Sequence, residues 1–277
     1  MEQVFINKII PFSCVDGFGN RTAIFLQGCN QDCQYCHNPE TIHLCTGCGA
    51  CVNVCPAKAL SLSKGRVIYD PETCCGCDTC LHTCTINASP KTRLMDAETV
   101  FSQIQSYFPF IDGITTSGGE CTLYPGFLTE LYRLVKAAGK TTYMDTNGQA
   151  PLWELPELLE VTDQTMIDLK AGTSKDHIRL TGRSYELPAE NIRRMAEMGK
   201  LYEIRTVVVP DIVDNKKTVE LGSQLIAAYP NIRYKLIKFR RYGVRKQFSD
   251  IREPSDEMME ELRQTARDLG VENVVLV

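Results

Sequence analysis

Beyond residue 90 the chain alternates between short apolar runs and longer segments whose apolar positions recur with helical spacing. The runs have the length of buried strands, and turn residues bound them. The expected strands are residues 21–28, 113–119, 141–148, 164–170, 202–210, 232–239 and 271–277, with 21–28 as the first apolar strand. The expected helices are 126–140, a short Leu- and Glu-rich one after 148, 174–182, 188–200, 216–229 and 255–270. This pattern predicts a parallel α/β protein with about six βα units, fewer than a closed barrel has.

Polar residues recur where these strands end. Barrel enzymes place their chemistry at the carboxyl ends of strands, so these side chains are predicted to converge on one face. Taken singly, the SGGE and TNG stretches also fit turns, and the acids also fit caps on backbone amides. The candidates, in chain order, are Ser117, Gly118, Gly119, Glu120, Asp145, Asn147, Asp168, Lys170, Arg205, Arg240 and Arg241.

Composition changes this picture mainly through cysteine. The 277 residues carry a formal net charge of −4, which gives no global reason to expect a nucleic-acid or anionic-membrane partner. No apolar run reaches the roughly 18 residues of a membrane span, and no signal-peptide cleavage site is evident, so a cytoplasmic location is expected. The cytosol keeps thiols reduced, and the 14 cysteines therefore favour metal binding over disulfides.

Eight cysteines form two runs with the same spacing, C-x2-C-x2-C-x3-C. Bacterial ferredoxins use this spacing for two [4Fe–4S] clusters, and the fourth cysteine of each run serves the other cluster. Zinc sites are the alternative, but four cysteines in so short a run favour clusters. Pro56 follows the first run and Thr85 the second, so the second turn is expected to differ. The predicted ligand sets are Cys45, Cys48, Cys51 and Cys84 for one cluster, and Cys74, Cys77, Cys80 and Cys55 for the other.

Three more cysteines, Cys29, Cys33 and Cys36, stand in the stretch GCNQDCQYCHNP. Three thiolates on a four-iron cluster leave one iron open to a substrate, and an open position is what makes a metal site catalytic. A zinc site completed by His37 is the alternative. The remaining cysteines are most simply buried small residues or spare thiols; they are Cys14, Cys75 and Cys121.

The C-x3-C-x2-C spacing resembles the radical S-adenosylmethionine (SAM) superfamily, in which the open iron is chelated by the amine and carboxylate of SAM. The stretches VDGFGNRTAIFLQGCNQDCQYCHNP, SGGE, DTNG, DLK and IRTVVVP follow one another over nearly the whole chain. In this order they resemble the glycyl-radical-enzyme activating enzymes. The insert directly after CHNP is similar to the subgroup with three clusters, and GITTSGGE and LTGR resemble the YjjW-type activases.

This resemblance implies a partial (β/α)6 TIM-like barrel, open at the side, formed by residues 1–39 and 90–277. A ferredoxin-like domain is inserted at 40–89. The implied cofactors are three [4Fe–4S] clusters and SAM, which one electron splits into methionine and a 5′-deoxyadenosyl radical. The radical removes hydrogen from the α-carbon of a glycine in a partner glycyl radical enzyme. A reduced flavodoxin or ferredoxin-type protein is the expected electron donor.

The resemblance also implies SAM contacts at Tyr35, Cys36, His37, Gly119, Asp168, Leu169 and Lys170. Residue chemistry adds that Gly118 and Gly119 permit close approach of the methionine moiety and that Glu120 suits its ammonium group. Asp168 and Lys170 are two apart on a strand, point to one side, and suit the ribose hydroxyls or the carboxylate. Asp145 together with Asp168 is a candidate site for a small monovalent cation.

Roles can also be predicted for two further stretches of the sequence. The VDG-x-G-x-R stretch is expected to shape the approach of the partner's glycine; it contains Asp16, Gly17, Gly19 and Arg21. Asp145 and Arg240 are also placed among the cofactor contacts, although relatives often carry a His after the sixth strand, where this chain has FRRYG. The basic stretch YKLIKFRRYGVRK fits a solvated strand end or a protein-docking surface better than a nucleic-acid site.

Several alternatives stay open. The insert is expected to relay electrons, but its clusters could also serve only to stabilise a domain that is too small for a core. For the whole chain, the alternatives to an activase are a radical SAM enzyme acting on a small molecule, an electron-transfer iron–sulfur protein and a zinc-binding module.

Overall fold

The computed structural model describes residues 2–277 and divides into two compact units. The first comprises the chain up to Asn30 together with Asn38–Lys140, and the second comprises Gln31–His37 together with Thr141–Val277. The short segment Gln31–His37 therefore packs with the later part of the chain. No helix in the part of the chain that the structure describes is long and apolar enough to cross a membrane.

The sheet of the first unit has the strand order β6-β2-β1-β5. Its strands are β1 (Val4–Ser13), β2 (Arg21–Leu26), β5 (Arg93–Met95) and β6 (Gly113–Gly118). Strands β2 and β6 are parallel and place Leu26 opposite Gly118, whereas β1 is antiparallel to both of its neighbours. Helices α3 (Ala97–Ile104) and α4 (Pro125–Ala137) contact each other and bury their apolar faces.

The expectation that 21–28 is the first apolar strand was wrong. The ten-residue β1 precedes it. A lysine and a proline interrupt the apolar pattern of this segment, VFINKIIPFS, and its register with β2 shifts twice. Because β1 is stabilised by pairing with strands on both sides, local periodicity alone did not reveal it. The short β5 and helix α3 were also missed.

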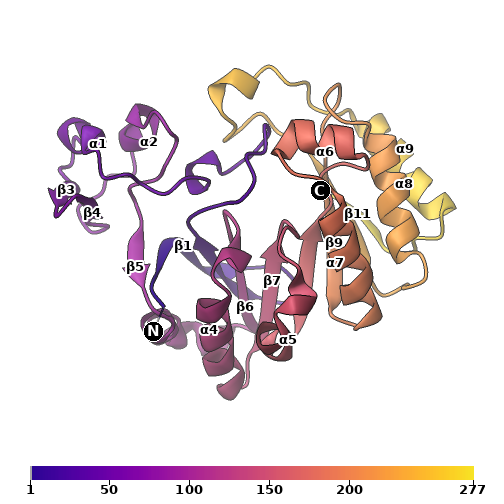
Figure 1. Cartoon of the computed structure of the whole chain (residues 1–277), viewed down its shortest axis with the longest axis horizontal. Coiled ribbons are helices and arrows are strands. Elements are labelled where there is room, and N and C mark those ends of the chain that lie inside the picture. Colours follow the sequence, from indigo (N-terminus) through magenta and orange to yellow (C-terminus); the bar gives the residue numbers. More distant parts are fainter. Residues whose placement is uncertain (1) are drawn as a thin grey trace. The chain divides into compact units, whose positions relative to one another are not determined.

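The insert of the first unit repeats one local structure. Helix α1 (Ala50–Val54) starts after Gly49, and helix α2 (Thr79–Thr83) starts after Asp78, both residues being in the left-handed region with φ of 77° and 56°. Each helix carries the third cysteine of its run, and the fourth cysteine is the C-cap. A hairpin of β3 (Leu60–Ser63) and β4 (Arg66–Tyr69) connects them, and in Figure 1 these elements lie apart from β1 and β6 of the same unit.

The second unit is built on parallel strands in the order β11-β10-β9-β8-β7. These are β7 (Thr141–Thr146), β8 (Gln164–Asp168), β9 (Leu201–Val208), β10 (Arg233–Lys238) and β11 (Val274–Leu276). The helices are α5 (Pro156–Val161), α6 (Ser174–Thr181), α7 (Glu186–Glu197), α8 (Asn215–Ile226) and α9 (Asp256–Asp268). The sequence of strands and helices predicted from 113 onward is confirmed, including the Ser255 N-cap of α9, whose side chain accepts from the Met258 amide.

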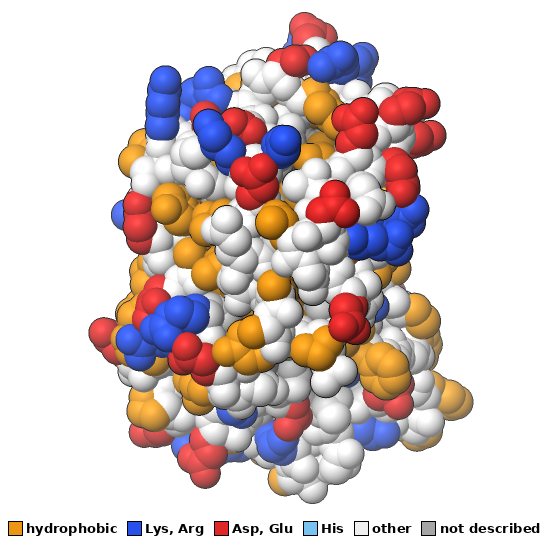
Figure 2. Space-filling model, turned by 90° about the vertical axis from the view of Figure 1, so that its right-hand side faces the viewer, with side chains coloured by type: hydrophobic (Ala, Val, Ile, Leu, Met, Phe, Trp, Pro, Cys, Tyr) orange, Lys and Arg blue, Asp and Glu red, His pale blue; other side chains and the backbone are white. Residues whose placement is uncertain are grey.

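The outer face of this unit is unremarkable in charge. Figure 2, which views the molecule from the side of α8 and α9, shows side chains of both signs interspersed with apolar ones. This mixture is typical of a solvated surface and agrees with the modest net charge of the chain.

Candidate functional site

The segment that carries Cys33 and Cys36 is fixed by backbone hydrogen bonds to the end of α6. The amide of Asp32 donates to the carbonyl of Thr181 at 3.1 Å, and the amide of Gln34 donates to that of Leu180 at 2.9 Å. Gly182 then ends α6 in the left-handed conformation, with φ of 78°. The LTGR stretch is therefore the support on which the cysteine segment lies.

Arg245 is the second anchor of this segment, and the sequence reasoning missed it. Its Nη1 lies 2.7 Å from Asp32 Oδ1, and its Nη2 donates to the Cys33 carbonyl at 2.9 Å. Arg240, which the sequence analysis proposed as a cofactor contact, is exposed. It contacts this segment through its backbone carbonyl, which lies 2.9 Å from His37 Nε2. Arg241 is likewise exposed and bonds to Glu253 and Ile251.

Tyr35 is buried beside Cys33 and Cys36 and close to two predicted cofactor contacts, Asp168 and Lys170. Its ring meets Phe239 edge-on, with centroids 6.4 Å apart, and Lys170 Nζ is 6.0 Å from its centroid. Burial raises the pKa of Tyr35 far above its ordinary value, so the hydroxyl keeps its proton. Within residues 2–277 this buried hydroxyl has no hydrogen-bond partner. An orphaned buried donor fits a site that a polar cofactor completes.

Lys170 and Asp168 form an ion pair in this site, with Nζ 2.7 Å from Oδ2. Burial alone disfavours the ammonium charge, but Asp168, and then Tyr35 and Cys33, more than offset it and raise the pKa of Lys170 well above its ordinary value. The site therefore holds a permanent cation beside the cysteine segment, suited to a carboxylate ligand. Leu169 between them is fully buried.

Asp145 and Arg205 form a second ion pair, at 2.9 Å. Arg205 also reaches the fully buried Glu203 at 2.7 Å, and Glu203 pairs in turn with Arg233 and Lys235. Asp168 lies opposite Arg205 in the strand register. The structure thus brings together the polar residues of β7, β8 and β9. It also gives both candidate cation ligands, Asp145 and Asp168, a cationic side chain as partner.

The SGGE stretch belongs to the first unit and lies against the residue before Cys29. The amide of Glu120 donates to the Gly28 carbonyl at 2.7 Å. A Cβ on Gly119 would lie 2.2 Å from that same oxygen, and a Cβ on Gly118 would lie 2.2 Å from the backbone of Leu26. Both glycines are therefore required by the close approach of two backbones.

Other candidates at strand ends have local partners. The buried Glu120 carboxylate accepts from the amide and hydroxyl of Thr122, at 3.0 and 2.6 Å, and begins a short helix. Asn147 accepts from the Gln149 amide at 2.9 Å, as in a turn. Ser117 is half-buried at the end of β6.

The loop 14–20 is held by the buried side chain of Arg21. Its guanidinium donates to the Thr115 hydroxyl at 2.9 Å and to the carbonyls of Ile114 at 2.6 Å and Phe18 at 3.2 Å. Asp16 accepts from the Ser13 hydroxyl, and Gly17 and Gly19 both have positive φ. Arg21 therefore fixes the loop conformation and is not itself available at the surface.

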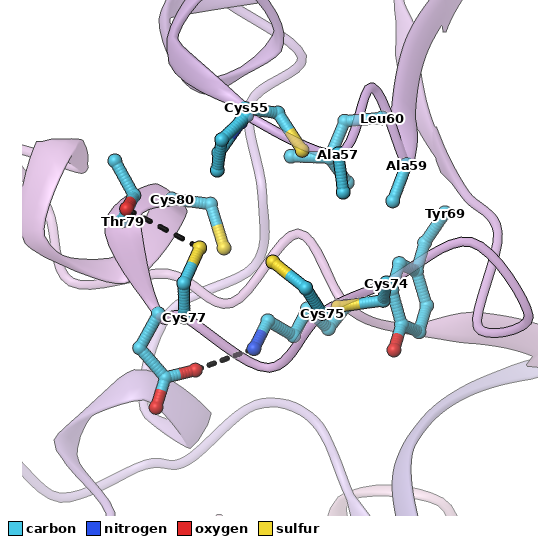
Figure 3. A pocket seen from close by; sticks show the side chains of 13 residues that line it. Cys55, Ala57, Ala59, Leu60, Tyr69, Cys74, Cys75, Cys77, Thr79 and Cys80 are labelled. Carbon is cyan, nitrogen blue, oxygen red and sulfur yellow. Dashed lines mark hydrogen bonds and ion pairs between the residues drawn. The ribbon is translucent and has the colours of Figure 1, made fainter.

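A cavity in the insert is lined by Cys55, Cys74, Cys77 and Cys80, the set predicted for one cluster. Figure 3 shows their sulfur atoms, and that of Cys75, turned toward one space. The set combines the fourth cysteine of the first run with three of the second. This donor set fits a [4Fe–4S] cube, which takes four thiolates.

The other set is represented by Cys51, which is buried in α1. Burial, followed by the neighbouring thiols of Cys45, Cys80 and Cys48, raises the pKa of Cys51 to about 11. Cys84 accepts from the amide of Ala88 at 3.3 Å. No three His, Cys, Asp or Glu side chains of residues 2–277 are grouped closely enough for a single metal ion. The ligands of a [4Fe–4S] cluster bind different irons of a larger core, so they need not lie as close together.

Comparison with known proteins adds family information. Residues 23–221 match the radical SAM superfamily. The chain is 30% identical to the isethionate sulfite-lyase activating enzyme of Desulfovibrio desulfuricans, over 88% of this chain and 86% of that protein. It is 28% identical to the trans-4-hydroxy-L-proline dehydratase activating enzyme of Clostridioides difficile, over 95% of both.

Solved structures agree on the fold. QueE from Escherichia coli superposes with a TM-score of 0.59 at 14% identity, covering 99% of this chain and 94% of that one. A domain of the pyruvate-formate lyase-activating enzyme from Bacteroides vulgatus gives a TM-score of 0.51 at 25% identity, covering 60% of this chain and 98% of that one. The α/β fold with a mostly parallel sheet is thus shared with these proteins.

Proposed function

Because the chain belongs to the radical SAM superfamily, as a glycyl-radical-forming activating enzyme, we propose that Cys29, Cys33 and Cys36 hold a [4Fe–4S] cluster with one open iron. The cluster, when bound, supplies the electron that splits SAM into methionine and a 5′-deoxyadenosyl radical. That radical takes hydrogen from the α-carbon of a glycine in a partner enzyme. The three-cysteine spacing and the anchored segment that carries Cys33 and Cys36 support this assignment.

The residues around the segment then have defined tasks. The Lys170 ammonium binds the carboxylate of SAM, and Asp168 keeps that ammonium charged and in place. The buried Tyr35 hydroxyl, which has no hydrogen-bond partner among residues 2–277, donates to a polar atom of the cofactor. His37 and Leu169 flank the cofactor. The half-buried Lys170–Asp168 pair beside the cysteine segment is the observation that carries the proposal.

The SGGE stretch of the first unit supplies further proposed SAM contacts. Gly118 and Gly119 hold the end of β6 against the residue before Cys29, and Glu120 presents a buried carboxylate suited to the amine of SAM. Asp145 and Arg240 stay in the proposed contact set. The ion pair of Asp145 with Arg205 gives that acid a structural task as well.

The insert is proposed to hold two further clusters. One takes Cys45, Cys48, Cys51 and Cys84, and the other takes Cys55, Cys74, Cys77 and Cys80. The cavity lined by the second set supports this pairing. We assign the insert an electron-relay task between an external flavodoxin- or ferredoxin-type donor and the open cluster. A solely stabilising insert is the alternative. Replacing the insert cysteines would then lower SAM cleavage with a protein donor and with a chemical reductant alike, whereas loss of a relay would spare cleavage by a chemical reductant.

The protein substrate is a glycyl radical enzyme. The activating enzymes of Desulfovibrio desulfuricans and Clostridioides difficile are named for the enzymes that they activate, a sulfite-lyase and a dehydratase. The resemblance of the GITTSGGE and LTGR stretches supports a YjjW-type activase. The LTGR stretch also supports the cysteine segment.

The test is anaerobic incubation of the reduced protein with SAM and candidate glycyl radical enzymes, followed by electron paramagnetic resonance (EPR). An activase gives the glycyl doublet with one partner, and Cys33→Ala gives neither the doublet nor 5′-deoxyadenosine. Formation of 5′-deoxyadenosine with no doublet for any partner would favour a small-molecule substrate. No SAM cleavage under any reductant would leave an electron-transfer protein.

A further inference from the structure

The cavity proposed for the second insert cluster contains a cation as well as cysteines. Lys91 lines it, and its ammonium forms an ion pair with Asp78, which also lines the cavity. Lys91 follows the second cysteine run and enters the cavity from outside the helix α2 that carries Cys80. Cys74 and Cys80 line the same cavity, so the Lys91 ammonium shares it with two of the proposed cluster ligands.

The two members of this ion pair do not cancel at the cavity. The Lys91 side chain is 20% exposed, whereas that of Asp78 is 51% exposed. Water and salt screen an exposed charge more than a sheltered one, so the field inside the cavity is dominated by the ammonium.

A hydrogen bond adds to this field. Tyr69 also lines the cavity, and its side chain is hydrogen-bonded to Cys74, beside which it lies in Figure 3. None of the four cysteines of the other set lines the cavity that Lys91 lines. Nearby positive charge and hydrogen bonds to sulfur favour the reduced state of a cluster, which carries one more negative charge.

We infer that Lys91 makes the cluster at Cys55, Cys74, Cys77 and Cys80 the first of the two insert clusters to be reduced. This inference rests on the two insert clusters of the proposed function. In the step concerned, a reduced flavodoxin- or ferredoxin-type donor loses one electron and this cluster gains it, passing from the 2+ to the 1+ state. No bond forms or breaks and no proton is required. Lys91 is thus a tuning residue that sets where electrons enter the relay.

The experiment is an anaerobic potentiometric titration followed by EPR, in the full chain with Cys29, Cys33 and Cys36 replaced by Ala. This background removes the third cluster and leaves about eight irons per chain in the insert. Lys91→Met is expected to move the higher of the two midpoint potentials to more negative values and to leave the lower one in place. Lys91→Arg, which keeps the charge, stays near the parent. Asp78→Asn, which suits the left-handed backbone of that position, moves the higher midpoint to more positive values.

The outcomes separate the two proposals. If all variants hold their iron and Lys91→Met leaves the higher midpoint in place, or shifts both midpoints equally, the tuning inference is wrong and the clusters stand. If the parent holds no iron in the insert, the cluster assignment itself fails and the inference with it. If Lys91→Met does not load clusters, the Asp78→Asn variant provides the test. A higher midpoint potential that does not move to more positive values in Asp78→Asn overturns the inference.

Discussion

The backbone amide of Glu120 donates a 2.7 Å hydrogen bond to the carbonyl of Gly28, the residue directly before the first cysteine of the triplet. Gly28 itself donates to Thr41, and Cys29 donates to Ile42 at 2.9 Å. The start of the triplet is therefore held from both sides by backbone contacts, which leave no room for side chains at the SGGE glycines.

Gly119→Ala is expected to disturb this contact. The new methyl would lie 2.2 Å from the Gly28 oxygen and 2.7 Å from the Thr41 oxygen, so one backbone must move. Overpacking of this kind costs roughly 1–3 kcal/mol. We expect less iron bound at the triplet and weaker SAM binding, measured by iron analysis and isothermal titration of the reduced protein.

The matched control is Gly126→Ala, in the first turn of α4. There the methyl would meet the flexible carboxylate of Glu2, whose movement is cheap. A normal iron content in Gly119→Ala would show that the close backbone approach does not position Cys29.

Arg245→Ala is expected to loosen the segment that carries Cys33. It removes the ion pair with Asp32 and the hydrogen bond to the Cys33 carbonyl. Hydrogen bonds to charged groups contribute about 1.5–3 kcal/mol each to stability, less where solvent screens them. We expect reduced cluster occupancy at the triplet and a lower yield of 5′-deoxyadenosine, with Arg245→Lys recovering only part of both.

Arg252→Ala tests whether any loss of an arginine in this region has the same effect. Its ion pair with Asp211 has side chains that are 65% and 68% exposed. Exposed pairs contribute about 0–1 kcal/mol, so this variant should behave as the wild type. Equal losses in the two variants would argue against a specific anchor at Cys33.

Cys74→Ala and Cys75→Ala are expected to differ, although both sulfurs face the same cavity. The Cys74 thiol is half-buried and accepts from the Gly76 amide at 3.5 Å, whereas Cys75 is exposed. Cys74 also has the ferredoxin spacing. Iron and sulfide analysis should show about four irons lost in Cys74→Ala and none in Cys75→Ala. The reverse result would make Cys75 the ligand.

His177 is expected to make stability fall below neutral pH. It is buried in α6, and burial lowers its pKa, as does the charge of Lys170. The hydrogen bond from His177 Nδ1 to the Arg183 carbonyl and the charge of Glu186 oppose this shift. Above the unfolded-state pKa of about 6.5, the neutral ring makes its full contribution to the free energy of unfolding. As the pH falls from there toward the folded-state pKa, this contribution is lost, because the unfolded chain takes up a proton that the folded chain does not.

His177→Asn keeps a donor for the Arg183 carbonyl but cannot titrate. The wild type should lose more of its urea midpoint between pH 7.5 and pH 5.5 than this variant, while His82→Asn, at an exposed position of α2, should follow the wild type. Parallel losses in all three proteins would place the pH dependence elsewhere.

Features that depend on local spacing could be predicted from the linear sequence. Cysteine intervals indicated the triplet and both runs, and the alternation of apolar runs indicated the parallel strands of residues 113–277. Spacing of this kind survives in the linear chain because ligand reach and strand periodicity extend over only a few residues.

Contacts between positions that are distant in the sequence became visible only in the folded chain. The hydrogen bond from Arg245 to Cys33 spans 212 residues, and Lys91 faces a cavity whose cysteines begin at Cys55. The basic stretch contains several arginines, and nothing local distinguishes Arg245 from the exposed Arg240. Which side chain becomes an anchor depends on packing of segments far apart in sequence, and that is fixed by burial and hydrogen bonding in the folded chain.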